Sequence, residues 1–204
     1  KNLNLHYSIL KNEELAFTLS SFFNDLYQDR EINTKDYLHN LIAPKEILNL
    51  PNELKINDYF SRTILVNGYP RIVEEGFLDK IITLNGDFDL ALHIQPYQLE
   101  TTMIMLNREL QKQRADLWSM KHKGIINPTL EIKYQDTKRV LESLQKGDEK
   151  LFNVSLYINC KAKSLEELNL LSKKVESELH ALLMTTFRPK YAMHQGMLST
   201  IPLG

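Results

Sequence analysis

The fold predicted for this sequence rests mainly on one stretch, Arg62–Pro96, which is RTILVNGYPRIVEEGFLDKIITLNGDFDLALHIQP. Its pattern indicates a strand, a sharp turn at 67–70, a short helix over 74–84, a second turn and another strand. In the second strand, apolar residues alternate with polar or small ones, which is the period of a sheet with one buried face. The predicted inward positions are Phe88, Leu90, Leu92 and Ile94. Pro96 should end the strand, because proline has no amide proton to donate to a ladder.

The same alternation returns in the stretch 150–162, KLFNVSLYINCKA. Ser164 and Glu167 then form a capping box that opens a helix, and a short β-like run follows at 184–188. The predicted inward positions of the strand are Phe152, Val154, Leu156, Ile158 and Cys160. Two strand–helix–strand units therefore predict an α+β fold with ferredoxin-like β-α-β units, in which helices cover one face of a mainly antiparallel sheet.

Between these units the period becomes helical. Asn127 caps a second helix with Pro128 at its first position. Apolar residues recur at three- and four-residue spacing in both helices, and Gln113 interrupts the first series. The seam consists of Met103, Leu106, Leu110, Leu117 and Met120 in the first helix, and Leu130, Tyr134, Thr137, Leu141 and Leu144 in the second. This pattern predicts an antiparallel coiled-coil hairpin.

The resulting domain layout has two parts. Residues 1–57 carry an amphipathic helix at 12–29 and extended pieces at 46–50 and 54–56. A ferredoxin-like domain covers 58–204, with the helical hairpin inserted at about 98–147.

Composition limits the class of protein. The chain has 204 residues, of which 43% are hydrophobic and 25% charged, and its net charge of −1 gives no general attraction for nucleic acid. The single cysteine, Cys160, fits a reducing compartment and is interpreted as a small buried hydrophobe rather than a nucleophile. No apolar run reaches the roughly 18 residues of a spanning helix, and no signal segment opens the chain. We therefore expect a cytoplasmic globular protein, and the terminal residues suggest an excised piece.

Motifs for catalysis are missing from the sequence. No G-x-x-x-x-G-K-[ST], G-x-G-x-x-G, H-E-x-x-H or C-x-x-C occurs, and the six histidines lack ligand spacing. Asp87 and Asp89 share one face of a strand, where they could bind a metal or share a proton, although a solvated sheet face is the commoner reading. The sequence predicts no catalytic residue, cofactor or metal here. A basic cluster around Lys121, His122 and Lys123 could contact phosphates or only aid solubility.

Several motifs, in order, resemble the N-terminal domain of the type IV secretion ATPases, the conjugation ATPases of the TraC/TrbE/CagE type. The resemblance runs from about Leu41 to Gly204. It is carried by LIAPKEI, LKINDYFSRTILVNGYPR, GDFDLALHIQP, QKGDEKLFNVSLYINCKAKSLEELNLLSKKVES and QGMLSTIPLG.

This resemblance implies a non-catalytic docking and assembly domain that precedes a RecA-like motor domain. The motor, with its ATP and Mg, would belong to the parent protein and not to these 204 residues. The implied partners are inner-membrane subunits of the secretion channel, the chain's own motor domain and further copies in a hexamer, with DNA contacted only indirectly. The implied location is the cytoplasmic face of the membrane.

Two surfaces are candidates for protein contacts. One is the corner formed by Tyr69, Pro70, Arg71 and Phe77, where an aromatic side chain and an arginine lie together, as in many interface anchors. Alternatively, Tyr69 and Phe77 only pack the turn. The other surface is the helical hairpin.

Two other functional classes remain open. A stand-alone ferredoxin-like module could bind a protein partner, or single-stranded nucleic acid by stacking bases on Tyr157 and His93. An enzyme that uses Asp87 and Asp89 is the third hypothesis.

Overall fold

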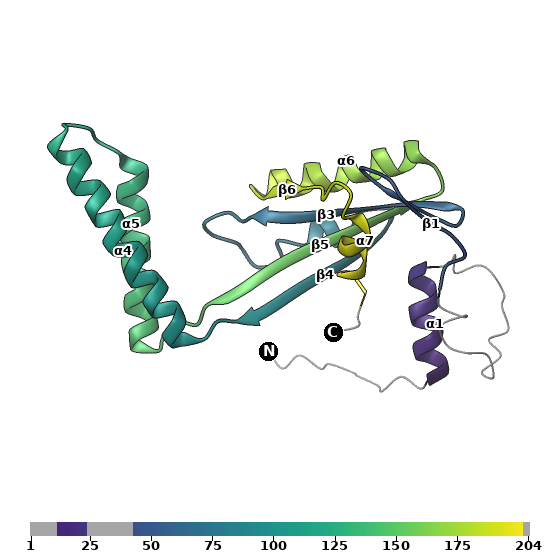
Figure 1. Ribbon diagram of the computed structural model, residues 1–204, viewed down its shortest axis with the longest axis horizontal. Helices are drawn as coiled ribbons and strands as arrows, with labels where there is room; N and C mark the ends of the chain where they lie inside the picture. The colour runs from purple at the N-terminus through teal and green to yellow at the C-terminus, as the bar shows by residue number, and fades with distance from the viewer. Residues whose placement is uncertain (1–11, 24–42, 202–204) are drawn as a thin grey trace. The chain divides into compact units, whose positions relative to one another are not determined.

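The computed structural model describes residues 12–23 and 43–201, and it contains both helices and strands (Figure 1). The helices are α1 (Asn12–Phe23), α3 (Asp79–Ile82), α4 (Leu99–His122), α5 (Pro128–Lys146), α6 (Leu165–Ala181) and α7 (Met193–Leu198). The strands are β1 (Ile47–Asn49), β2 (Leu54–Ile56), β3 (Tyr59–Gly68), β4 (Asp87–Pro96), β5 (Phe152–Ala162) and β6 (Thr185–Phe187). The N-terminal helix predicted for 12–29 is observed as α1, and its last six positions lie outside the described residues.

The strands form one six-stranded antiparallel sheet in the order β1-β2-β3-β5-β4, and β6 also pairs with β3. Strands β3 and β5 pair from Phe60 opposite Ala162 to Val66 opposite Leu156. The predicted extended pieces are confirmed as β1 and β2. Asn57 forms the turn into β3: it has a φ of 49°, and its side chain accepts hydrogen bonds from the backbone amides of Lys45 and Glu46. The chain is therefore α+β, as predicted.

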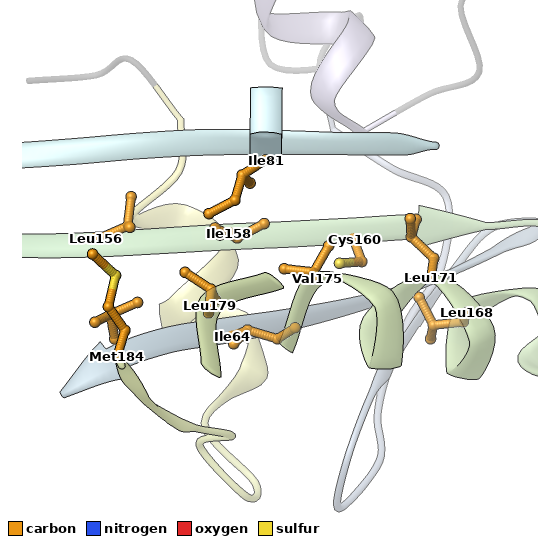
Figure 2. Close-up of a cluster of buried hydrophobic side chains, with 11 residues drawn as sticks. Ile64, Ile81, Leu156, Ile158, Cys160, Leu168, Leu171, Val175, Leu179 and Met184 are labelled. Carbon is orange, nitrogen blue, oxygen red and sulfur yellow. The ribbon is translucent and has the colours of Figure 1, made fainter. Parts of the chain in front are cut away.

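The main core lies between the sheet and helix α6 (Figure 2). Inward residues of β3 and β5 meet one stripe of α6, and Ile81 of α3 and Met184 join the same cluster. The strand residues are Ile64, Val66, Leu156, Ile158 and Cys160, and the helix residues are Leu168, Leu171, Val175 and Leu179. The predicted inward positions are thus confirmed for the central part of β5. Ser164 caps α6 by accepting a hydrogen bond from the Glu167 amide, as the capping box predicts.

Helix α7 covers the opposite face of the sheet, so the prediction of helices on one face only is wrong. Met193 and Met197 of α7 are buried with Leu54 and Ile56 of β2. Gly196 lies against Thr63, and a Cβ at this glycine would be 2.9 Å from the threonine side chain. The missing side chain therefore lets α7 approach β3 closely.

Two local predictions are also corrected. The helix predicted for 74–84 is only α3, because Gly76 has a φ of +73° and interrupts the helical backbone before Asp79. At its other end the helix stops at Thr83, before the turn at Asn85-Gly86. In the strands, the outer ends of the predicted apolar faces are exposed rather than buried, at Leu92, Ile94 and Phe152.

The chain divides into two compact units, residues 1–92 with 155–204 and residues 93–154. The second unit contains the predicted helical hairpin, and α4 and α5 lie antiparallel (Figure 1). The seam is confirmed, since Leu141 and Leu144 are buried and Gln113 is buried among the seam positions of α4. Asn127 caps α5 by accepting from the Leu130 amide at 3.1 Å, and Gly147 ends this helix with a φ of 79°.

Candidate interaction site

The end of β3, which leads into the corner, is held against β6 by backbone pairing and a side-chain hydrogen bond. Gly68 lies opposite Thr185 in the ladder, and a Cβ at this glycine would collide with the threonine hydroxyl. The Thr185 hydroxyl donates a hydrogen bond of 2.9 Å to the side-chain carbonyl of Asn67. These contacts fix the backbone from which the next residues project.

Tyr69 and Arg71 are the exposed members of the predicted site. Tyr69 is 37% exposed, and Arg71 is exposed beyond the half-buried Pro70. Burial of part of the ring raises the pKa of the Tyr69 hydroxyl. A hydrogen bond with the Leu156 backbone opposes this rise, and the neighbouring Tyr157 adds to it. Tyr69 is therefore anchored along one edge while much of its ring remains accessible to a partner.

Phe77 has a different position. It is half-buried and packs against the main core with its neighbour Leu78. Phe77 lies within a tight turn, in which the Asp79 amide donates to the Gly76 carbonyl at 2.9 Å. The alternative interpretation of Phe77, as a residue that packs the turn, therefore fits its surroundings, and its role in the site is to support the loop.

Sequence reasoning missed two apolar residues of the same loop. Ile72 is 79% exposed and Val73 is 42% exposed, directly after Arg71. The available signal was an apolar pair between charged residues in a segment without helical or strand periodicity. Together with Tyr69 and Arg71 they form what we call the corner surface, residues 69–73.

In the described part of the chain, no third ligand joins Asp87 and Asp89 to form a metal site. Asp89 lies 2.7 Å from the ammonium of Lys161, whose charge is also 5.2 Å from the centre of the Phe22 ring. Asp87 is exposed at the start of β4. Among residues 12–23 and 43–201, no group of three His, Cys, Asp or Glu side chains is arranged to hold a metal ion.

Arg62 is a buried charged residue whose side chain connects separate elements of the fold. It is 3% exposed, and its guanidinium donates to the Asn52 carbonyl at 3.0 Å, to Asn169 at 2.8 Å and to Glu53 at 2.9 Å. The last contact is an ion pair. Because these bonds connect β3, the β1–β2 turn and α6, Arg62 holds elements together and is not presented to a ligand.

The two residues that could stack bases in the nucleic-acid alternative, His93 and Tyr157, lie on β4 and β5. His93 is exposed, whereas Tyr157 is only half-exposed and lies close to Tyr69. Part of the Tyr157 ring is therefore covered within the fold.

Comparison of the chain with protein-family models and with curated proteins gave no match. In the described part of the chain, no helix is both long and apolar enough to cross a membrane.

Proposed function

We propose that this chain is the N-terminal docking and assembly domain of a conjugative type IV secretion ATPase. Apart from the sequence motifs and their order along the chain, one structural observation supports this proposal most strongly. The strand order β6-β3-β5-β4, with α3 between β3 and β4 and α6 between β5 and β6, supports a ferredoxin-like arrangement. The common packing of Ile81 from α3 with the buried stripe of α6 supports it further, because both crossover helices then cover one face.

In this proposal the chain has no catalytic role. ATP and Mg would be bound by a motor domain of the parent protein, which assembles as a hexamer. The domain would hold that motor against inner-membrane channel subunits at the cytoplasmic face and transmit its movements to them. DNA would be contacted only indirectly.

The corner surface is the proposed contact with the channel subunits. Tyr69 and Arg71 supply the residue types that most often dominate interface energies, and Ile72 and Val73 add exposed apolar area beside them. The backbone beneath is fixed by β6 and by the packing of Phe77, so little conformational freedom is lost on binding.

The first test is the double substitution Tyr69→Ala with Arg71→Ala. Binding to purified channel subunits, measured by surface plasmon resonance, should weaken at least about 30-fold, which corresponds to about 2 kcal/mol for a pair of anchor residues. The control exchanges another exposed apolar and cationic pair, Leu170→Ala with Lys174→Ala on α6, and should bind normally. Unchanged binding by the first variant, with normal circular dichroism, would remove the corner surface from the proposal.

The motor assignment has its own test. The coding sequence downstream of Gly204 should continue in frame to a G-x-x-x-x-G-K-[ST] motif, because a backbone cradle and a lysine are required to hold the phosphates. A stop codon at that point would refute the ATPase assignment and leave a regulatory or scaffold protein.

A further inference from the structure

The tip of the helical hairpin is a rigid turn that presents two isoleucines. At the end of α4, Gly124 has a φ of 68°, its amide donates to the Lys121 carbonyl, and the Ile125 amide donates to the Met120 carbonyl at 2.9 Å. These two bonds are a Schellman motif. The Asn127 cap then starts α5. Ile125 and Ile126 lie between the two caps and are 54% and 89% exposed.

The last turns of α4 add an aromatic residue to this tip. Trp118 is 64% exposed, and its ring lies 4.0 Å from that of His122, centre to centre. The His122 ring also contacts the Trp118 carbonyl at 3.1 Å. Because residues four apart share a face of a helix, Arg114 lies on the same side as Trp118. The tip therefore combines exposed apolar side chains with cationic ones.

Charge is distributed unevenly along the hairpin. Residues 112–133 contain five lysine or arginine side chains, all exposed, against two acidic residues. The cations are Lys112, Arg114, Lys121, Lys123 and Lys133, and the acids are Asp116 and Glu131. The rest of the second unit, 93–111 and 134–154, contains five cations against six acids. Positive charge is thus concentrated around the exposed isoleucines, in a chain whose net charge is −1.

We infer that the hairpin tip, residues 112–133, docks onto the surface of an anionic lipid bilayer. Isoleucine side chains would enter the boundary between head groups and acyl chains, Trp118 would lie at the level of the head groups, and the lysines would meet lipid phosphates. The caps on both sides hold the turn in shape before it binds. This inference rests on the tip alone and does not depend on the proposed ATPase assignment.

A bilayer fits these residues better than nucleic acid does. Single-stranded nucleic acid is bound by aromatic platforms beside cations, and the tip has a tryptophan for that purpose. However, Ile125 and Ile126 are both exposed, and their side chains would gain nothing from contact with a phosphate backbone. In a bilayer the same two side chains are transferred out of water, which is favourable.

The experiment uses the intrinsic fluorescence of the full chain, because Trp118 is its only tryptophan and lies at the tip. Vesicles of equal parts phosphatidylglycerol and phosphatidylcholine should shift its emission to shorter wavelength, and lipids brominated near the glycerol should quench it. Flotation with the same vesicles should recover the protein at low salt, and less of it at high salt. Vesicles of pure phosphatidylcholine should give no emission shift, no quenching and no flotation.

Two variants and one control separate the contributions. Lys121→Gln with Lys123→Gln should weaken vesicle binding about 25-fold, since each lysine near an anionic surface contributes about a factor of five. Ile125→Ser with Ile126→Ser should reduce flotation even at low salt. Ile104→Ser changes an isoleucine of matched exposure, 55%, near the start of α4, and should bind normally.

Two outcomes would overturn the inference. One is a response of Trp118 to a labelled single-stranded oligonucleotide without any response to anionic vesicles, which would assign the tip to nucleic acid. The other is equal flotation of the wild-type chain and the Ile125→Ser, Ile126→Ser variant, which would place lipid binding elsewhere or exclude it.

Discussion

At the scale of single residues, Cys160 is the clearest case of chemistry controlled by packing. Its thiol is fully buried between β5 and α6 (Figure 2). Burial raises its pKa from 9.0 to about 12, while a hydrogen bond with Ser172 and the charge of Arg62 oppose that rise. Because the thiolate is the nucleophile, the folded protein keeps this group unreactive at neutral pH.

This pKa predicts a specific pH dependence of stability. Below pH 9 the thiol is protonated in both states, but between pH 9 and 12 the unfolded chain loses the proton while the folded chain keeps it. The free energy of unfolding of the wild type should therefore fall relative to Cys160→Ala, by up to about 1.4 kcal/mol per pH unit. Urea titrations of both proteins from pH 8 to pH 10.5 measure this difference. If the free energies of unfolding of the two proteins change equally with pH, the thiol ionises in the folded state as readily as in the unfolded chain.

At the scale of the elements, Gln113 is the irregular position in the hairpin seam. It is buried, and its amide donates to Glu109 at 3.2 Å on the same helix. Among the described residues its side-chain carbonyl has no hydrogen-bond partner. A polar residue at one seam position lowers stability but favours a single register.

We therefore predict that Gln113→Leu stabilises the hairpin. Removing an unsatisfied buried carbonyl and adding apolar contact should raise the free energy of unfolding by about 1–2 kcal/mol. Guanidinium denaturation followed by circular dichroism measures it, and Gln111→Leu, at an exposed position of the same helix, is the control. A loss of stability would mean that Gln113 has a partner that its present contacts do not include.

The elements also show which features can be predicted from the sequence. The hairpin seam and the Asn127 cap of α5 were predictable, because helix period and capping depend on residues a few positions apart. Alternation in β4 and β5 identified a shared face, but not how far the core extends along it, so the exposure of Leu92 and Phe152 was missed. The covering of the second face by α7 depends on Gly196 meeting Thr63, a contact between distant residues that no local pattern indicates.

The candidate site was predictable to a similar extent. A turn with proline and an aromatic residue indicated the corner surface, and Tyr69 and Arg71 are exposed there. The exposure of Ile72 had no periodic signal to identify it, and the packing of Phe77 follows from tertiary contacts alone.

At the scale of the whole molecule, the cores of the first unit are built without the second. Among the described residues, the main core takes its members from 60–90 and 156–184, and the smaller cluster beside α7 takes its members from 23, 54–59 and 193–197. Residues 93–154 contribute to neither. The hairpin has its own seam, around Leu141 and Leu144. The cores that stabilise the first unit and the residues of the proposed lipid contact therefore lie in different parts of the chain.

We predict that replacing residues 98–147 by a short Gly-Ser linker leaves the first unit folded. Its thermal transition should remain cooperative and shift by only a few degrees, because no core contact is lost and a short flexible loop costs little entropy to close. The same variant should lose flotation with anionic vesicles while keeping its affinity for channel subunits, since residues 69–73 are unchanged. Calorimetry, flotation and surface plasmon resonance on one preparation measure these three properties. Loss of the cooperative transition would show that the hairpin is required for the first unit to fold, and retained flotation would assign lipid binding to the first unit.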